Sequence, residues 1–147
     1  MKLVMTLSTV SLLTLISIVH VYWAFGGRWG KHAAIPSQAG ENRPAFVPGK
    51  MATLFVAVLL LIACLILLVQ SGYTQYLQAS MMTRIGCVVC GSVFLLRAIG
   101  DFRFVGFFKK INHSVFAKND TWLYSPLCLY CGVTFMMVGL RQQLLGI

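Results

Sequence analysis

Hydrophobic residues along the chain fall into four long blocks, separated by two basic loops and one short uncharged turn. The blocks predict membrane-spanning helices at about residues 3–25, 51–70, 81–101 and 125–145. Each block is close to the roughly 20 residues that a helix needs to cross a bilayer. No segment outside the blocks is long enough to build a core of its own, so residues 1–147 are expected to form a single domain. The predicted fold class is all-α, a four-transmembrane-helix bundle.

The first block carries a polar residue at every third position. These residues are Ser8, Ser11, Thr14, Ser17 and His20. Over one or two turns this spacing gives a stripe that winds slowly around a helix. Small hydroxyl side chains allow close helix approach, so the stripe is expected to face the bundle. His20 lies about two turns inside the end of the helix and has two interpretations, a ligand-facing residue or a structurally hydrogen-bonded one.

The third block places a charged pair at its end. Five positions at helical spacing predict one face of this helix: Gly86, Cys90, Val93, Arg97 and Asp101. Arg97 and Asp101 are four residues apart and are expected to pair if the helix continues through Gly100. Charges this close to hydrocarbon are costly, and they mark either a functional site or a structural ion pair.

Two further segments complete the chain. Residues 102–108 are rich in phenylalanine and precede Lys109 and Lys110, which predicts an interfacial segment between the third and fourth helices. The fourth helix is expected to start at Ser125-Pro126, because Ser is a good N-cap and Pro suits the first helical position. Gly132 and Gly139 are seven residues apart and predict a packing strip.

Composition agrees with an integral membrane protein. The chain is 59% hydrophobic and only 10% charged, with a mean hydropathy of +0.83. Its net charge of +9 would suggest nucleic acid in a soluble protein, but here the cations sit in short loops beside apolar spans. That arrangement sets membrane orientation and contacts anionic head groups. We therefore expect a membrane partner and no nucleic acid.

The basic residues also predict an orientation. Nine of the twelve Lys and Arg residues belong to the first and third loops, counting Arg97. The positive-inside rule then places both loops in the cytoplasm and both chain termini outside. The second and fourth helices would begin on the cytoplasmic side, where their positive dipole ends and the Arg side chains favour an anion.

The cysteines form two C-x-x-C patterns, Cys87/Cys90 and Cys128/Cys131, which can indicate zinc binding or thiol exchange. All four lie inside predicted spans, whereas structural zinc sites usually lie in loops. A reducing cytoplasm also disfavours a stable disulfide near that face. We interpret them as small packing residues, with a membrane thiol oxidoreductase as the less favoured alternative, and we expect no metal and no cofactor.

Three motifs resemble those of a known family. They are His20-Val21-Tyr22-Trp23-Ala24-Phe25-Gly26-Gly27, then Arg97-Ala98-Ile99-Gly100-Asp101-Phe102-Arg103, and Asp120-Thr121-Trp122-Leu123-Tyr124-Ser125-Pro126-Leu127-Cys128. They resemble an uncharacterised bacterial family of small four-helix membrane proteins, described as a domain of unknown function. The resemblance supports the four-helix architecture and the choice of site residues, and it supplies no activity. We expect the protein in a bacterial inner membrane. The positions that match are His20, Trp23, Gly27, Arg97, Asp101, Arg103, Asp120, Tyr124, Ser125 and Pro126.

Together these observations predict one polar site at the cytoplasmic interface. Its expected residues are His20, Trp23, Arg97, Asp101, Arg103, Asp120, Tyr124 and Ser125. The arginines would hold an anionic group, and Asp101 and Asp120 would orient them. His20 or Tyr124 could move a proton if chemistry occurs.

The favoured function is binding of an amphipathic anionic ligand, such as a lipid or an isoprenoid phosphate. A first alternative is an enzyme acting on that ligand, with His20, Asp101 and Tyr124 as candidate catalytic residues. A second alternative is a structural or assembly subunit whose ion pairs hold the bundle together. The sequence leaves the oligomeric state and the protein partners open.

Overall fold

The computed structural model describes residues 1–35, 48–74, 76–100, 106–108 and 115–144, and all regular structure in these ranges is helical. The elements are α1 (Lys2–Ala24), α2 (Lys31–Ala34), α3 (Lys50–Ser71), α4 (Met81–Ile99), α5 (Val115–Asn119), the π-helical turn η1 (Asp120–Tyr124) and α6 (Ser125–Leu144). Four helical stretches are long and apolar enough to cross a membrane: α1, α3, α4 and the continuous stretch Phe116–Arg141. The predicted all-α fold with four membrane spans is confirmed.

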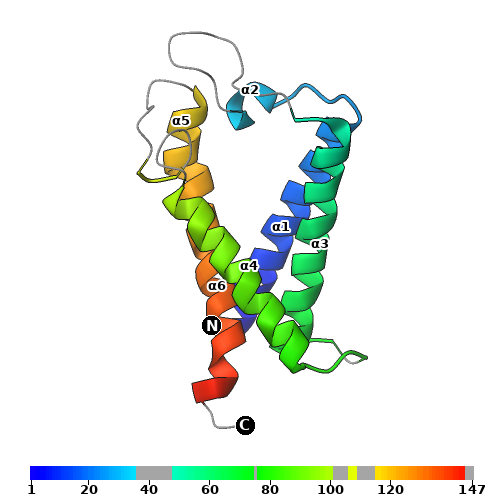
Figure 1. Ribbon diagram of the computed structural model, residues 1–147, viewed down its shortest axis with the longest axis vertical. Coiled ribbons are helices and arrows are strands. Elements are labelled where there is room, and N and C mark those ends of the chain that lie inside the picture. Colours follow the sequence, from blue (N-terminus) through cyan, green and yellow to red (C-terminus); the bar gives the residue numbers. More distant parts are fainter. Residues whose placement is uncertain (36–47, 75, 101–105, 109–114, 145–147) are drawn as a thin grey trace.

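Successive spans alternate in direction, so the loops that follow α1 and α4 lie at the same end of the molecule (Figure 1). We call this end, which holds α2 and α5, the loop end. The opposite end, where α1 begins and α6 ends, is the termini end. The most extensive helix contacts join α1 to α3 and α4 to α6. The two pairs meet near the termini end and diverge toward the loop end, where α2 contacts α5 (Figure 1).

Helices α3 and α4 are connected by a turn whose local chemistry stops one helix and starts the next. Gly72 ends α3 with a φ of 78°, a left-handed conformation that glycine adopts without strain. Ser80 and Thr83 form a capping box at the start of α4. The Thr83 hydroxyl also donates to the Gln70 side-chain oxygen at 2.6 Å, which ties the end of α3 to the start of α4.

Glycines bring α4 and α6 into close contact. A Cβ atom at Gly91 of α4 would lie 2.9 Å from the Met136 side chain and 3.3 Å from the Gly132 carbonyl oxygen. Further along the same α4–α6 contact, a Cβ atom at Gly139 would lie 3.1 Å from the Cβ atom of Cys87. Both Gly132 and Gly139 are buried, so the predicted packing strip on the fourth span is confirmed. Small residues have this effect in membranes because van der Waals packing supplies much of the helix association.

The buried core combines residues from all four spans. Leu13 of α1, Leu67 of α3, Cys87 of α4, and Cys131 and Phe135 of α6 are fully buried in one cluster. The rings of Phe94 and Phe135 stack with centroids 5.7 Å apart across the α4–α6 contact. Cys87 and Cys131 therefore fill the core, as the packing interpretation of the cysteines expects.

The polar stripe of α1 faces the bundle only in part. The Ser8 hydroxyl lies 2.7 Å from the Tyr130 hydroxyl of α6, and Ser17 donates to the Ala57 carbonyl oxygen of α3 at 2.9 Å. Ser11 is exposed, whereas Thr9, outside the predicted stripe, is fully buried. A step of three residues turns 300° around a helix, so a stripe at that spacing cannot follow one face.

The buried face of α4 differs from the face that the helical spacing groups together. The fully or nearly fully buried residues of this helix are Cys87, Gly91 and Ala98, one position away from the expected set. Val93, a member of the grouped set, is 58% exposed. The reason is that α4 turns its smallest residues toward α6, where the backbones approach most closely.

The glycine contact gives a first prediction. Replacing Gly91 with Leu should lower the free energy of unfolding by about 1–3 kcal/mol, because the larger side chain has no space against Gly132 and Met136. Reversible unfolding in mixed detergent micelles measures this change. Val93→Leu, at an exposed position of the same helix, is the matched control and should change stability little. Equal stability of the two variants would contradict the close packing of α4 and α6.

Candidate functional site

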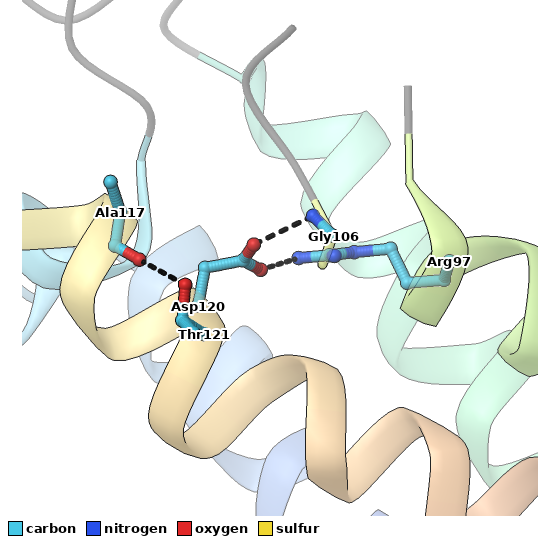
Figure 2. A network of polar contacts seen from close by, with 5 residues as sticks. All are labelled: Arg97, Gly106, Ala117, Asp120 and Thr121. Carbon is cyan, nitrogen blue, oxygen red and sulfur yellow. Dashed lines mark hydrogen bonds and ion pairs between the residues drawn. The ribbon is translucent and has the colours of Figure 1, made fainter. Parts of the chain in front are cut away.

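A buried ion pair joins α4 to the turn that precedes α6. Arg97, in the last turn of α4, donates from Nη2 to Oδ1 of Asp120 at 2.9 Å. The Asp120 side chain is fully buried, and that of Arg97 is 34% exposed. Figure 2 shows the guanidinium reaching across from α4 to this carboxylate. A buried carboxylate needs such partners, because leaving it unpaired would cost several kcal/mol.

The second carboxylate oxygen of Asp120 is bonded to the loop that follows α4. The backbone N–H of Gly106 donates to Oδ2 at 2.7 Å (Figure 2). Gly106 has a φ of 91°, and a Cβ atom here would collide with the backbone of Ile99 and Gly100. Phe107 then donates from its N–H to the Ala98 carbonyl oxygen at 3.0 Å. Asp120 thus fixes both the last turn of α4 and residues 106–107 against the fourth span.

The geometry around Asp120 depends on the π-helical turn. In η1 the Ser125 N–H bonds to the Asp120 carbonyl oxygen, five residues back. Pro126 lacks an N–H and its ring clashes with the preceding turn, so a widened turn just before it keeps the helix continuous. Ser125 has helical backbone angles and is no N-cap. Helix α6 itself begins at Ser125, as predicted, but Ser125 does not cap it, because α5 and η1 continue the helical chain back to Val115.

Two buried polar atoms of Arg97 and Ser125 lack a partner among the described residues. Within the described residues, Arg97 Nη1 and the Ser125 hydroxyl are buried and make no hydrogen bond. Ser125 is fully buried at the start of α6, directly after the η1 turn that carries Asp120. Buried polar groups in folded proteins are nearly always bonded, so these two atoms are unusual features of the site.

Several aromatic residues belong to the same end of the molecule as the pair. Trp122, two residues after Asp120, is 84% exposed. The ring of Tyr124 is half-buried and packs near that of Phe116, with centroids 6.1 Å apart. Phe107 and Phe108 are exposed at the same end. An exposed Trp near the end of a helical stretch that can cross a membrane is typical of the headgroup region.

His20 and Trp23 form a separate group on α1. His20 Nδ1 lies 2.8 Å from the Ile16 carbonyl oxygen, and its ring lies 5.3 Å from that of Trp23. Trp23 donates from Nε1 to the Trp29 carbonyl oxygen at 2.8 Å. No hydrogen bond or ion pair in the described part of the chain links His20 to Arg97 or Asp120. Among the expected site residues, the structure joins Arg97 to Asp120, and Tyr124 and Ser125 follow Asp120 along the same helical stretch. His20 and Trp23 belong to the other helix pair.

The glycine at the end of the first motif has a structural explanation. Gly27 packs against the face of the Tyr22 ring, and a Cβ atom at this position would overlap that ring. Its N–H donates to the Tyr22 carbonyl oxygen at 3.0 Å. The motif thus folds the chain back onto the last turn of α1.

Two predicted site residues, Asp101 and Arg103, lie outside the described residues. The expected Arg97–Asp101 pair required α4 to continue through Gly100, but α4 ends at Ile99. Gly100 has a φ of 90° and a ψ of −174°, which breaks the helical path. The predicted end of this span, residue 101, is therefore two residues beyond the observed end of α4. Gly106, which donates to Asp120, is not among the residues predicted for the site. Its position within a phenylalanine-rich segment is the feature of the sequence that could have indicated it.

The cysteines do not assemble a site in the described residues. All five are free thiols: Cys64, Cys87 and Cys131 are buried, and Cys90 and Cys128 are half-buried. No group of three or more His, Cys, Asp or Glu side chains in the described ranges could hold a metal ion.

Fold and site together define a multi-pass helical membrane protein with a buried ion pair at one end. A family model described as "Protein of unknown function (DUF3995)" matches residues 13–135, which is most of the chain. The chain therefore belongs to this family, and the resemblance noted from its three motifs is confirmed. No curated protein and no solved structure matches the chain.

The ion pair gives a second prediction. Arg97→Met and Asp120→Asn should each destabilise the protein, Arg97→Met more strongly because it leaves a buried carboxylate without its cation. Combined in one chain, they should cost less than their sum, with a coupling energy of about 1–3 kcal/mol. A double-mutant cycle from unfolding in detergent micelles measures this quantity. Additive effects would show that the pair contributes nothing to stability.

Proposed function

We propose that this protein binds an amphipathic anion, such as a lipid or an isoprenoid phosphate, at the loop end, with Arg97 as the anion-binding residue. One observation carries the proposal: Arg97 keeps a buried Nη1 without an acceptor in the described residues, although Nη2 is bonded to Asp120. A guanidinium presents its donors as a planar fork that suits phosphate and carboxylate oxygens. An anionic oxygen beside Nη1 would supply the missing acceptor.

The charge of the loop end supports an anionic ligand. Arg28, Lys31, Lys50 and Lys118 are described cations at this end, and Asp120 is the described carboxylate, already paired. Helix α3 also begins here, so the positive end of its dipole adds to the potential. Positive charge at headgroup depth attracts anionic lipids.

In this proposal the neighbouring residues have distinct roles. Asp120 is a positioning residue that holds the guanidinium through Nη2. The Ser125 hydroxyl, buried and without a bond in the described structure, is a second polar group for the ligand. Tyr124 borders the site, and the one third of the Arg97 side chain that is exposed gives a head group access. A ligand oxygen would reach Nη1 by displacing one of the side chains that shield it.

A structural role is the second candidate. It is favoured by the bonding of Asp120, whose two oxygens both accept from the protein and whose side chain is fully buried. Such a carboxylate could serve only to hold α4 and the fourth span together, as in an assembly subunit. The enzyme hypothesis needs His20 or Tyr124 within reach of Asp101 or Asp120. Asp101 lies outside the described residues, and no hydrogen bond in the described part of the chain links His20 to Asp120.

Native mass spectrometry tests lipid binding. Protein released from nanodiscs that contain phosphatidylcholine with either phosphatidylglycerol or undecaprenyl phosphate should retain an anionic lipid. Arg97→Lys keeps the positive charge but loses the fork, so the lipid retained at this site should fall roughly tenfold. Retention of only one of the two probes would distinguish a phospholipid from an isoprenoid phosphate.

The matched control is Arg84→Lys, which alters the other arginine of α4 at the termini end and should retain this lipid. Thermal unfolding checks that both variants are folded. A folded Arg97→Lys protein with unchanged lipid retention would contradict the proposal. Wild-type protein that holds no anionic lipid, combined with strong Arg97–Asp120 coupling in stability, would favour the structural role.

We also propose that the loop end faces the cytoplasm of a bacterial inner membrane and that both termini lie outside, because most Lys and Arg residues belong to the loops at that end. Alkaline phosphatase fused after residue 147 should be active in cells, and green fluorescent protein at the same site should be dark. A fluorescent, phosphatase-negative pair of fusions would reverse the orientation.

A further inference from the structure

A second feature lies at the termini end, away from the Arg97–Asp120 pair. A cavity of about 910 Å³ is bordered by the first turns of α1 and the second half of α6, and α4 contributes Leu95. Its volume is in the range of roughly 300–1,000 Å³ that is typical of ligand sites. Neither Arg97 nor Asp120 lines it, so the loop-end site does not account for it.

The cavity wall is apolar and opens to the outer surface of α6. Val133, Met137 and Leu140 line it, and each of these side chains is more than a third exposed. Because α6 is part of a membrane-spanning stretch, these exposed side chains face lipid. Met5 lines the cavity from α1. Methionine side chains are flexible and adapt to irregular apolar ligands such as acyl chains.

The hydroxyl groups in the wall are already bonded within the protein. Thr6 Oγ1 lies 3.3 Å from the Ser71 hydroxyl, and Thr134 donates to the Tyr130 carbonyl oxygen at 2.9 Å. These side chains therefore offer little to a polar ligand. The middle of the cavity therefore suits a hydrocarbon chain better than a polar group.

Cations, in contrast, border the cavity. Lys2 Nζ donates to the Ser71 carbonyl oxygen at 2.8 Å and lies 5.7 Å from the centroid of the Tyr73 ring, which fixes its position. An ammonium group has three donors, so others remain for a ligand. Arg141, in the last turn of α6, is exposed and has no ion pair among the described residues. In the described part of the chain, no Asp or Glu lies at the termini end to neutralise these cations.

We propose that this cavity binds one anionic phospholipid from the leaflet at the termini end. Lys2 and Arg141 hold its phosphate, and an acyl chain lies along Met5, Val133 and Met137. The combination of an apolar interior, a lipid-facing opening and two unneutralised cations matches an anionic amphiphile. This site is independent of the loop-end site, so the protein would hold two anionic lipids, one at each end.

Native mass spectrometry from nanodiscs of phosphatidylglycerol and phosphatidylcholine with identical acyl chains tests the proposal. The wild-type protein should retain phosphatidylglycerol in preference to phosphatidylcholine. The double variant Lys2→Gln/Arg141→Gln should lower retention at this site roughly tenfold, since two charge-assisted contacts are lost. Arg84→Gln removes a cation of the same end that does not line the cavity, and it should retain the lipid.

Filling the cavity gives a test that leaves the charges in place. Met137→Trp should displace the lipid, whereas Val93→Trp, at an exposed position that does not line the cavity, should not. Arg97→Lys should leave this lipid bound, which separates the outcome from that of the loop-end site. Equal retention of both lipids by the wild type, or unchanged retention in folded Met137→Trp, would overturn the proposal. A lipid-free dimer that Met137→Trp dissociates would overturn it too, by assigning the cavity to a second copy.

Discussion

The contacts at the loop end depend on the carboxylate of Asp120. It accepts from Arg97 through one oxygen and from the Gly106 backbone through the other, while being fully buried. A charge in this position is stable only if both oxygens are bonded, so the carboxylate requires α4, the loop after it and the fourth span to keep their relative positions. The widened turn at Pro126 allows the helix that carries Asp120 to remain continuous. The same constraint positions Arg97, whose remaining donors define the candidate anion site.

Elsewhere the bundle is held by close packing and by short polar contacts between helices. Gly91 and Gly132 bring the backbones of α4 and α6 together, and hydroxyl groups of α1 bond to α3 and α6. These interactions suit a membrane, where apolar side chains gain little from leaving lipid and packing must supply the specificity. They also leave most of the outward-facing surface apolar, and the polar and charged groups are concentrated at the two ends of the spans.

That distribution of charge connects the two proposed lipid sites. Most Lys and Arg residues belong to the loops of the loop end, and its described residues include one carboxylate, which is buried and paired. The candidate site at this end is Arg97, whose Nη1 has no acceptor among the described residues. The termini end has fewer cations, and its site depends on a cavity between α1 and α6. The two proposed sites therefore differ in how they would bind an anionic lipid. The loop-end site would use the guanidinium of Arg97, and the termini-end site would use an apolar cavity bordered by Lys2 and Arg141.

The four spans, the all-helical fold and the Gly132–Gly139 strip could be predicted from the sequence, because apolar block length and residue size are local properties. The sequence also singles out Arg97 and Asp120, since charges beside hydrocarbon are unusual. Which charges pair could not be predicted: spacing suggested Arg97 with Asp101, but Gly100 ends α4 and the partner in the described structure is Asp120. Tertiary structure likewise decided the separation of His20 from that pair, the role of Gly106 and the helical turns α5 and η1 that precede Ser125. Each depends on which helix faces which across the bundle, and a periodic pattern within one helix does not contain that information.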